Sequence, residues 1–454
     1  MKVKRFLAFV AALILLPVFT ACEEQPPEKE KIMLTFVYAH DSASSSDLLL
    51  ETLLKATDQF NQDNSQTFRI EMEAITTHFD EIAPYFDELN KLAASNQLPD
   101  LIWMPDGAVM KEYAGAGHLA DLTSYLEEDD AWRESFWDGT FVSTAHDGGI
   151  FAVPLCLRLD CLFYNTELFT EADVKAEEIQ TWDDFLAACQ TLKDAGIQPL
   201  AMGGEEPENI SYFTNYLVQR LGGVEPMQQI IDREDGVRFD QDCFIRAGQM
   251  TYELLQNGYL PSDTASTTND EAGAAFRNGE AAMFCSGSWA VGGFHRDDSQ
   301  IIDKVGVLPF PVVEEGKGQA NHWFVEMNAS VAVSAQSKHI EQAVQWLKYL
   351  TADSVQAMMA EEGYQFPATK AVFQADLAPK EYTFIRETLK RDGMTASGFF
   401  DHVLGEAMGK AYQETLWEIL IGTDSAEAFQ NLQAQVQEYL TLEPAEKNTD
   451  QTKE

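Results

Sequence analysis

The sequence predicts an α/β protein with two bodies, each a doubly wound, mostly parallel sheet flanked by helices. Apolar runs of strand length alternate with helical segments, which is typical of sheets whose strands are joined by crossover helices. The alternation continues past residue 152 into a second body. A chain of 454 residues is also long enough for two or three domains.

The first body is predicted from three strands and two helices. The strands are expected at 32–38, 68–73 and 100–104, and the helices at 47–61 and 79–95. Ligands of such sheets bind beyond the carboxyl ends of the strands. Here those ends lead into loops that hold His40, Asp41 and Asp106.

The second body is predicted from a further alternation with clear helix signals. Thr181 begins a helix with the capping pattern Thr-Trp-Asp-Asp, and Gly222-Gly223 ends another. Strands are expected at 149–154, 155–165, 305–311 and 330–333, helices at 212–221, 242–256 and 340–350, and a mainly helical pattern at 354–440.

The N-terminal segment is typical of a signal peptide. Lys2, Lys4 and Arg5 precede the apolar stretch 6–19, and Thr20-Ala21 lead into Cys22. The ending resembles a bacterial lipobox, which implies that Cys22 carries a lipid; an ordinary secretory signal beside a cysteine is the alternative. We expect residues 1–21 to be removed, 22–31 to form a polar tether and 441–454 to be a disordered tail.

The composition excludes polyanionic partners. The net charge is -43, and removal of the signal, with its three basic residues, leaves -46. Such a surface repels nucleic acid and anionic head groups, so a neutral or cationic ligand is expected. An acidic surface is also what a salty or alkaline habitat would favour.

The remaining cysteines predict neither a disulfide framework nor a metal site. They lack a CxxC pair and most have apolar neighbours, so buried free thiols are expected rather than bridges. The eight histidines are scattered, and neither a metal nor another cofactor is expected. The five cysteines concerned are Cys156, Cys161, Cys189, Cys243 and Cys285.

Several motifs, in their order and spacing, resemble the extracellular solute-binding proteins of ABC-type sugar importers, including maltodextrin-binding and multiple-sugar-binding lipoproteins. The resemblance covers nearly the whole chain after the signal. It is carried by the motifs at 98–104, 116–122, 152–155, 163–168, 181–185, 278–284, 287–289 and 307–311.

This resemblance implies a periplasmic-binding-protein-like fold of two lobes with a ligand cleft at the hinge. Lobe one would comprise 32–152 and 308–350, and lobe two 153–307 and 351–440. The implied function is capture of a neutral mono- or oligosaccharide and its delivery to a membrane permease driven by a separate ATPase. The protein would be a monomer, lipid-anchored on the extracytoplasmic face and without catalytic activity.

Sugar binding requires aromatic faces against the C–H side of a pyranose. Trp289 matches a stacking position of maltodextrin-type members, on a turn after a strand, although a core role is the alternative. Tyr212 and Phe400 match two further stacking positions, but both lie in segments whose apolar stripes need aromatics in any case. Trp323 is an additional candidate without a family match.

Sugar binding also requires polar groups that pair with hydroxyls. Asp106 matches an acidic sugar-contacting position of the family, and Arg158 stands where maltodextrin binders carry a Glu. Asp160 lies on the same strand face as Arg158 and can pair with it, either to present both to a diol or as a structural ion pair. Glu326, His40 and Asp41 complete the candidates.

Two other functions remain open at this stage. A surface glycoside hydrolase would need paired carboxylates across a cleft, which Asp106, Asp160 and Glu326 could supply. The same fold could also bind a peptide, a metal chelate or another non-sugar solute. The sequence contains no GxSxG, HExxH or Walker motif.

Overall fold

The computed structural model describes residues 31–41, 48–64, 66–77, 82–104, 107–137, 139–234, 236–370, 380–383, 385, 387 and 395–442. The predicted signal, Cys22 and nearly all of the predicted tail therefore lie outside the described residues. Within them, no helix is both long enough and apolar enough to cross a membrane.

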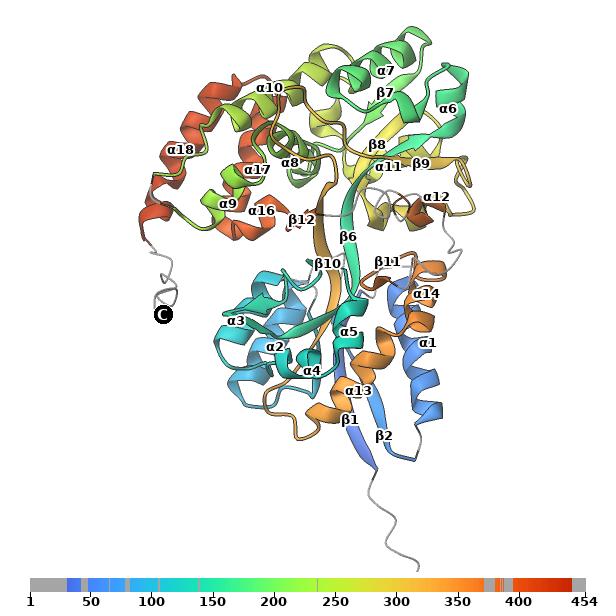
Figure 1. Ribbon diagram of the computed structural model, residues 1–454, viewed down its shortest axis with the longest axis vertical. Coiled ribbons are helices and arrows are strands. Elements are labelled where there is room, and N and C mark those ends of the chain that lie inside the picture. The colour runs from blue at the N-terminus through green and yellow to red at the C-terminus, as the bar shows by residue number, and fades with distance from the viewer. Residues whose placement is uncertain are drawn as a thin grey trace, which may run out of the picture.

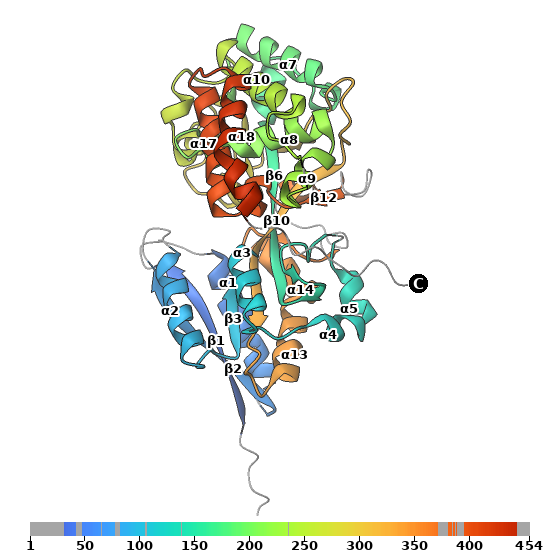
Figure 2. The ribbon, with the colours of Figure 1, turned by 90° about the vertical axis from the view of Figure 1, so that its left-hand side faces the viewer.

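Two α/β lobes share one continuous sheet with the strand order β2-β1-β3-β10-β6-β8-β7. Figures 1 and 2 show the lobes one above the other, with β6 (Ala152–Asn165) and β10 (His322–Val333) running between them. The two strands pair antiparallel from Ala152 to Leu159 of β6. The two-lobed fold expected from the sequence is confirmed.

The first lobe has a parallel core of strands. β1 pairs with β2 in register from Ile32↔Phe68 and with β3 on its other edge. The lobe comprises β1 (Ile32–Asp41), α1 (Leu48–Asp63), β2 (Phe68–Thr77), α2 (Ala83–Ala94), β3 (Leu101–Met104), α3 (Gly107–Gly115), α4 (Thr123–Glu127), α5 (Asp130–Ser135), β4 (Ala145–His146), β5 (Gly149–Ile150), α13 (Ile340–Leu350), α14 (Asp353–Glu361) and β11 (Phe366–Pro367).

In the second lobe β7 and β8 are parallel, whereas β6 pairs antiparallel with β8 and β9. The lobe comprises α6 (Thr166–Glu171), η1 (Ala176–Glu178), α7 (Trp182–Asp194), β7 (Gln198–Ala201), α8 (Glu208–Gly222), α9 (Glu225–Ile231), α10 (Asp242–Gln256), η2 (Thr264–Ser266), α11 (Asn269–Arg277), β8 (Ala281–Gly287), η3 (Ser288–Ala290), α12 (Val291–Phe294), β9 (Val305–Leu308), β12 (Thr395–Ser397), α16 (Phe400–Val403), α17 (Glu406–Leu420) and α18 (Ser425–Leu442).

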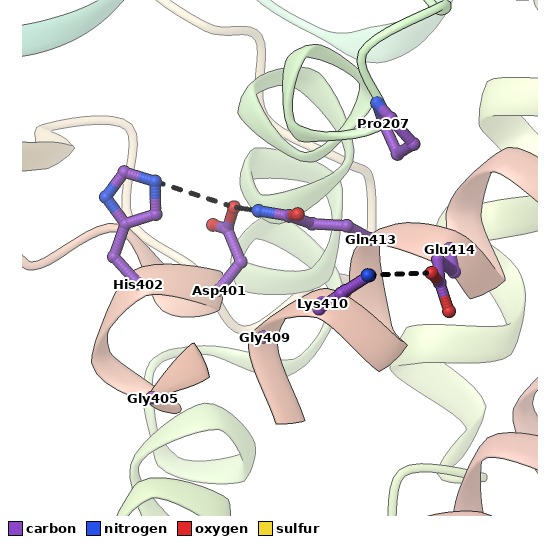
Figure 3. A pocket seen from close by; sticks show the side chains of 8 residues that line it. All are labelled: Pro207, Asp401, His402, Gly405, Gly409, Lys410, Gln413 and Glu414. Atoms are coloured by element: carbon purple, nitrogen blue, oxygen red, sulfur yellow. Dashed lines mark hydrogen bonds and ion pairs between the residues drawn. The ribbon is translucent and has the colours of Figure 1, made fainter. Parts of the chain in front are cut away.

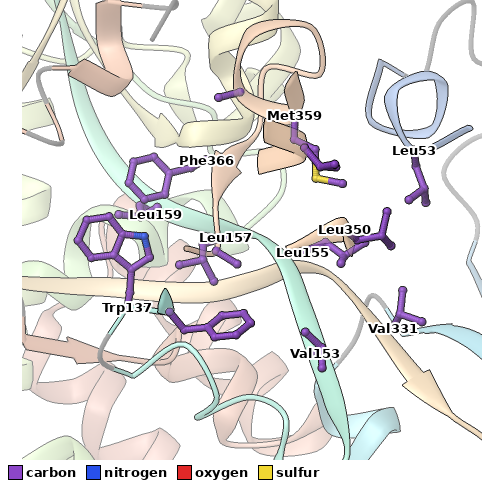
Figure 4. Close-up of a cluster of buried hydrophobic side chains, with 14 of the residues drawn as sticks. Leu53, Trp137, Val153, Leu155, Leu157, Leu159, Val331, Leu350, Met359 and Phe366 are labelled. Carbon is purple, nitrogen blue, oxygen red and sulfur yellow. The ribbon is translucent and has the colours of Figure 1, made fainter. Parts of the chain in front are cut away.

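The crossing strand β6 is fixed by its alternating apolar residues. Val153, Leu155, Leu157 and Leu159 are all buried and enter a cluster that also contains Phe366 (Figure 4). Successive side chains of a strand point to opposite faces, so the even-numbered residues of this stretch face the other side. That alternation places Arg158 and Asp160 together on the face away from this cluster.

Local helix signals act as the sequence predicts. Thr181 and Asp184 form a reciprocal capping box at the start of α7. Gly223 ends α8 at a φ of 79°, a conformation that favours glycine. In α13, the buried residues recur at helical spacing and pack on the first lobe.

The structure departs from the expected lobe boundaries in two places. The chain stays with the second lobe beyond residue 308, because buried Arg220 of α8 donates hydrogen bonds to the carbonyl oxygens of Phe310, Ala320 and His322. It enters the first lobe only along β10. At the other boundary, α14 packs on α1, α13 and β11, so residues 353–361 lie with the first lobe.

Secondary structure differs from the expectation in the same region. β10 begins at His322 instead of residue 330, because its first half alternates buried side chains with the polar Glu326 and Asn328 and lacks a continuous apolar run. The segment predicted as helical includes the short strands β11 and β12, which pair with the crossing strands. The five described cysteines are free thiols.

Candidate functional site

An ion pair sits on the crossing strands themselves. Arg158 of β6 and Glu326 of β10 are direct partners in the antiparallel ladder, and Arg158 donates from Nη2 to Glu326 Oε2 at 2.5 Å. The Nε of Arg158 is buried and has no hydrogen-bond partner among the described residues. The pair thus keeps an unused donor at the junction between the lobes.

His402 connects this pair to the second lobe. Its Nδ1 lies 2.9 Å from Glu326 Oε2, and its Nε2 lies 3.0 Å from Oε1 of Glu208, the first residue of α8. Tyr212, one helical turn later, donates its hydroxyl to the same Glu208 oxygen at 2.6 Å. Arg158, Glu326, His402, Glu208 and Tyr212 form one network, which we call the hinge network.

The hinge network stabilises its own charges. Burial opposes the charge of His402, but hydrogen bonds to Glu208 and Glu326 raise its pKa to about 11. Burial likewise opposes ionisation of Glu208, but the His402 hydrogen bond lowers its pKa to about 2. The pKa of Glu326 is lowered too, because hydrogen bonding by His402 and the charge of Arg158 outweigh burial. At neutral pH the network holds two cations and two carboxylates.

An aromatic cluster borders the hinge network. Trp289 of η3 makes edge contacts with Tyr212, with ring centroids 5.4 Å apart, and tilted contacts with Phe399 at 6.3 Å. The Arg158 guanidinium lies 5.8 Å from the Trp289 ring and 5.7 Å from the Phe399 ring. Of the three aromatics, only Trp289 is partly exposed.

Gly287 explains the placement of Trp289. A Cβ at Gly287 would fall 1.7 Å from the indole ring, so the ring lies directly on the glycine backbone. The indole is therefore held on one side by the chain before it. This Gly-Ser-Trp turn presents an aromatic surface next to the partly exposed side chain of Arg158, which suits a ligand with both C–H and hydroxyl surfaces.

Two predicted contact residues lie beneath this surface. Asp160 is 1% exposed, and burial followed by the charge of Asp401 raises its pKa well above the usual range. Asp160 does not pair with Arg158, whose partner is Glu326. Phe400 is 1% exposed and packs against Phe239, Phe244 and Tyr412 in the second lobe's core. Its neighbour Phe399 instead contacts Trp289.

Trp323 is also buried. It is 4% exposed and lines a small cavity of about 10 Å³ with Asp160, Tyr216, Arg220 and His322. That volume suffices for about one water molecule. Trp323 therefore belongs to the interior of the second lobe below the hinge network.

The first-lobe candidates are only partly described. His40 and Asp41 were predicted in the loop after a strand at 32–38, but the structure extends β1 to Asp41 and pairs both residues with Thr76 and Thr77 of β2. His40 is partly buried, and no described contact joins it to the hinge network. Asp106 lies outside the described residues.

Sequence reasoning missed Lys111, Glu208, Phe399 and His402. Lys111 of α3 is half-buried and makes neither an ion pair nor a hydrogen bond with any residue that the structure describes. Burial lowers its pKa, against the attraction of Glu326. A single His or Lys outside a motif gives no sequence signal. The adjacent aromatics Phe399 and Phe400 did indicate an aromatic contact in this segment.

A pocket of about 410 Å³ adjoins the hinge network on the second lobe (Figure 3). His402 lines both the pocket and the network. The lining residues are Pro207, Asp401, His402, Gly405, Gly409, Lys410, Gln413 and Glu414. We call this the α16–α17 pocket.

Comparisons with known proteins agree with this architecture. The model of the family described as "Bacterial extracellular solute-binding protein" matches residues 54–357. The chain belongs to this family. By that description, its members bind solutes outside the cell.

Curated relatives match over part of their length. The xylose/arabinose-binding protein XacG of Haloferax volcanii is 27% identical over 65% of this chain and 61% of its own. The multiple sugar-binding protein of Streptococcus mutans is 24% identical over 57% of this chain and 59% of its own. The chain thus spans about three fifths of the length of these relatives.

Solved structures cover the fold more completely. A protein studied for xylan utilization by the thermophilic bacterium Caldanaerobius polysaccharolyticus has a TM-score of 0.73 at 23% identity, over 89% of this chain and 100% of its own. A chitin oligosaccharide binding protein also has a TM-score of 0.73, at 22% identity over 90% of this chain and 99% of its own. At these identities the likeness establishes the fold.

Proposed function

We propose that this solute-binding protein captures a carbohydrate between its lobes and delivers it, unchanged, to the permease of an ABC importer. The observation that carries the proposal is the partly exposed Trp289 beside Arg158 and Glu326 on the two crossing strands. An aromatic face and planar hydrogen-bonding groups are what a pyranose requires. Relatives are named as binding xylose, arabinose or multiple sugars, which supports the same class here.

The position of the network favours hinge closure. Arg158 and Glu326 lie where the strands pass from one lobe to the other, so a ligand on them contacts the centre of the hinge. Lys111 approaches Glu326 from the first lobe. A sugar that contacts Lys111 of the first lobe as well as Arg158 would link the two lobes, and such contacts would favour closure.

A binder without turnover fits the carboxylates better than a hydrolase does. Asp160 is 1% exposed and cannot reach a glycosidic bond, and Glu326 is occupied by Arg158 and His402. Retaining and inverting glycosidases both require two carboxyl groups that face the scissile bond. Glu208, the other carboxylate of the hinge network, is likewise bonded to His402 and Tyr212.

We further propose that the mature protein is a monomer held at the extracytoplasmic face of the membrane by a lipid on Cys22. The basic, apolar and small-residue order of residues 1–22 supports this anchor. A lipid anchor would keep the binding lobes near the permease.

Thermal-shift screening tests the proposed function. Purified protein without its signal would be heated with pentoses, hexoses, their oligomers, amino acids and peptides. A sugar at a hundred times its Kd should add about 2.7 kcal/mol of apparent stability. Chromatography after a day should recover that sugar unaltered; stabilisation only by a non-sugar solute, or hydrolysis of the sugar, would contradict the proposal.

A further inference from the structure

The α16–α17 pocket continues the candidate site away from the hinge. His402 forms a common wall, with its ring nitrogens bound to Glu326 and Glu208 of the hinge network. Pro207, which immediately precedes α8 and Glu208, lies on the opposite side of the pocket (Figure 3). A ligand seated on the hinge network therefore has this pocket as its immediate neighbour.

Two of the residues that line the pocket are glycines, Gly405 and Gly409. Gly409 faces the carbonyl of Asp401 so closely that a Cβ there would lie 2.1 Å from the oxygen. Gly405 has a φ of 80° and begins α17, and no atom lies within 4 Å of the position of a Cβ. Gly405 therefore leaves open space in which a ring could rest, whereas Gly409 allows α17 to pack closely on the backbone of Asp401.

Hydrogen bonds hold the polar groups of the pocket in place, and these groups retain further hydrogen-bonding capacity. Buried Asp401 accepts hydrogen bonds from Ser211, Asn215 and Gln413. The bond from Gln413 Nε2, at 2.7 Å, fixes that amide and leaves its Oε1 without a described donor. Lys410 and Glu414 are more than half exposed and lie 3.9 Å apart, which is too weak a contact to occupy either.

These features suit a second sugar ring. Gly405 and the ring of Pro207 offer contact for C–H groups, while Gln413, Lys410 and Glu414 offer an acceptor, a donor and a carboxylate for hydroxyls. The volume of about 410 Å³ lies within the range of roughly 300–1,000 Å³ that small-molecule sites occupy. Charges of both signs balance, which favours a neutral unit over an ionic one.

We propose that the α16–α17 pocket binds the second unit of an oligosaccharide whose first unit lies on Trp289 and the hinge network. This inference rests on the proposed function and adds the ligand's minimum length of two units. A monosaccharide would use the hinge network alone and bind more weakly.

The test compares chain lengths. Affinities for xylose, xylobiose and xylotriose, and for glucose, maltose and maltotriose, would be measured by calorimetry with the wild type and with Lys410→Trp, which fills the pocket from its exposed rim. Lys175→Trp is the matched control, because Lys175 is exposed on the same lobe and pairs with Glu178. Unfolding midpoints verify that each variant is folded.

In the wild type the disaccharide of the preferred series should bind at least tenfold more tightly than its monosaccharide. Lys410→Trp should reduce this ratio to below threefold, and Lys175→Trp should retain it. Equal affinities for one and two units in the wild type, or a ratio unchanged in Lys410→Trp, would overturn the inference while leaving the proposed function intact. Binding of no sugar at all would overturn both.

Discussion

Replacement of Trp289 by alanine separates a ligand-contacting role from a core role. In the structure the indole is partly exposed and makes contacts with Tyr212 and Phe399. Aromatic pairs contribute about 0.5–1.5 kcal/mol each, so the two contacts predict a loss of about 1–3 kcal/mol of folding stability. A fully buried Trp would cost about 3–5 kcal/mol.

Binding should change more distinctly than folding. Loss of the stacking surface should weaken sugar affinity by one to two decades, or about 1.4–2.8 kcal/mol. Calorimetric titration and chemical denaturation of Trp289→Ala measure both quantities. Phe400→Ala is the control, because a fully buried ring should cost about 3–5 kcal/mol of stability while affinity stays within twofold.

The opposite pattern would refute the reasoning. Affinity of Trp289→Ala within twofold of the wild type, together with a stability loss as large as that of Phe400→Ala, would show that Trp289 is a core residue. The sugar would then have to bind elsewhere.

Four other substitutions give independent tests. The pKa of Asp160 is raised, so the stability it contributes is present at low pH and is lost as the pH rises; Asp160→Asn should raise the unfolding midpoint at pH 8, and a lower midpoint would contradict this. The pKa of His402 is raised from 6.5 to about 11, so its contribution to folding stability is complete below pH 6.5 and is lost as the pH rises through 11. His402→Gln should therefore reduce the fall in the free energy of unfolding over that pH interval, and an unchanged fall would contradict this. Lys111→Met should weaken sugar binding about tenfold, or about 1.4 kcal/mol, without lowering the unfolding midpoint. The exposed control Lys91→Met should change neither the affinity nor the midpoint. Cys22→Ala should release the protein from the membrane with its sugar affinity unchanged, and continued membrane fractionation would disprove the lipid anchor.

The sequence was sufficient for the elements that have regular signals. The helix predicted at 242–256 coincides with α10, and the capping pattern at Thr181 forms the expected box. β10 was recognised only in its apolar second half, because the polar residues His322, Glu326 and Asn328 interrupt the apolar residues of its first half. Strands that serve two environments lack the uniform pattern on which such predictions depend.

The candidate site was predicted in part. Arg158, Glu326, Tyr212 and Trp289 are brought together, from segments more than a hundred residues apart at the extremes. Asp160 has the right strand parity but lies one pair deeper, where Tyr216, Phe310 and Trp323 surround a small cavity beside it. Parity alone gives the face of a strand and not its depth, and it gives no information on partners such as His402, which reaches the network from the C-terminal helices.

The most direct test of the proposed function is a calorimetric titration of the wild type with the sugar that gives the largest thermal shift. We predict saturable binding of one sugar molecule per chain, and a sharp loss of that binding when Arg158 is replaced by alanine. Full-strength binding to Arg158→Ala, or the absence of binding heat with every sugar at several temperatures, would contradict a sugar site on the crossing strands.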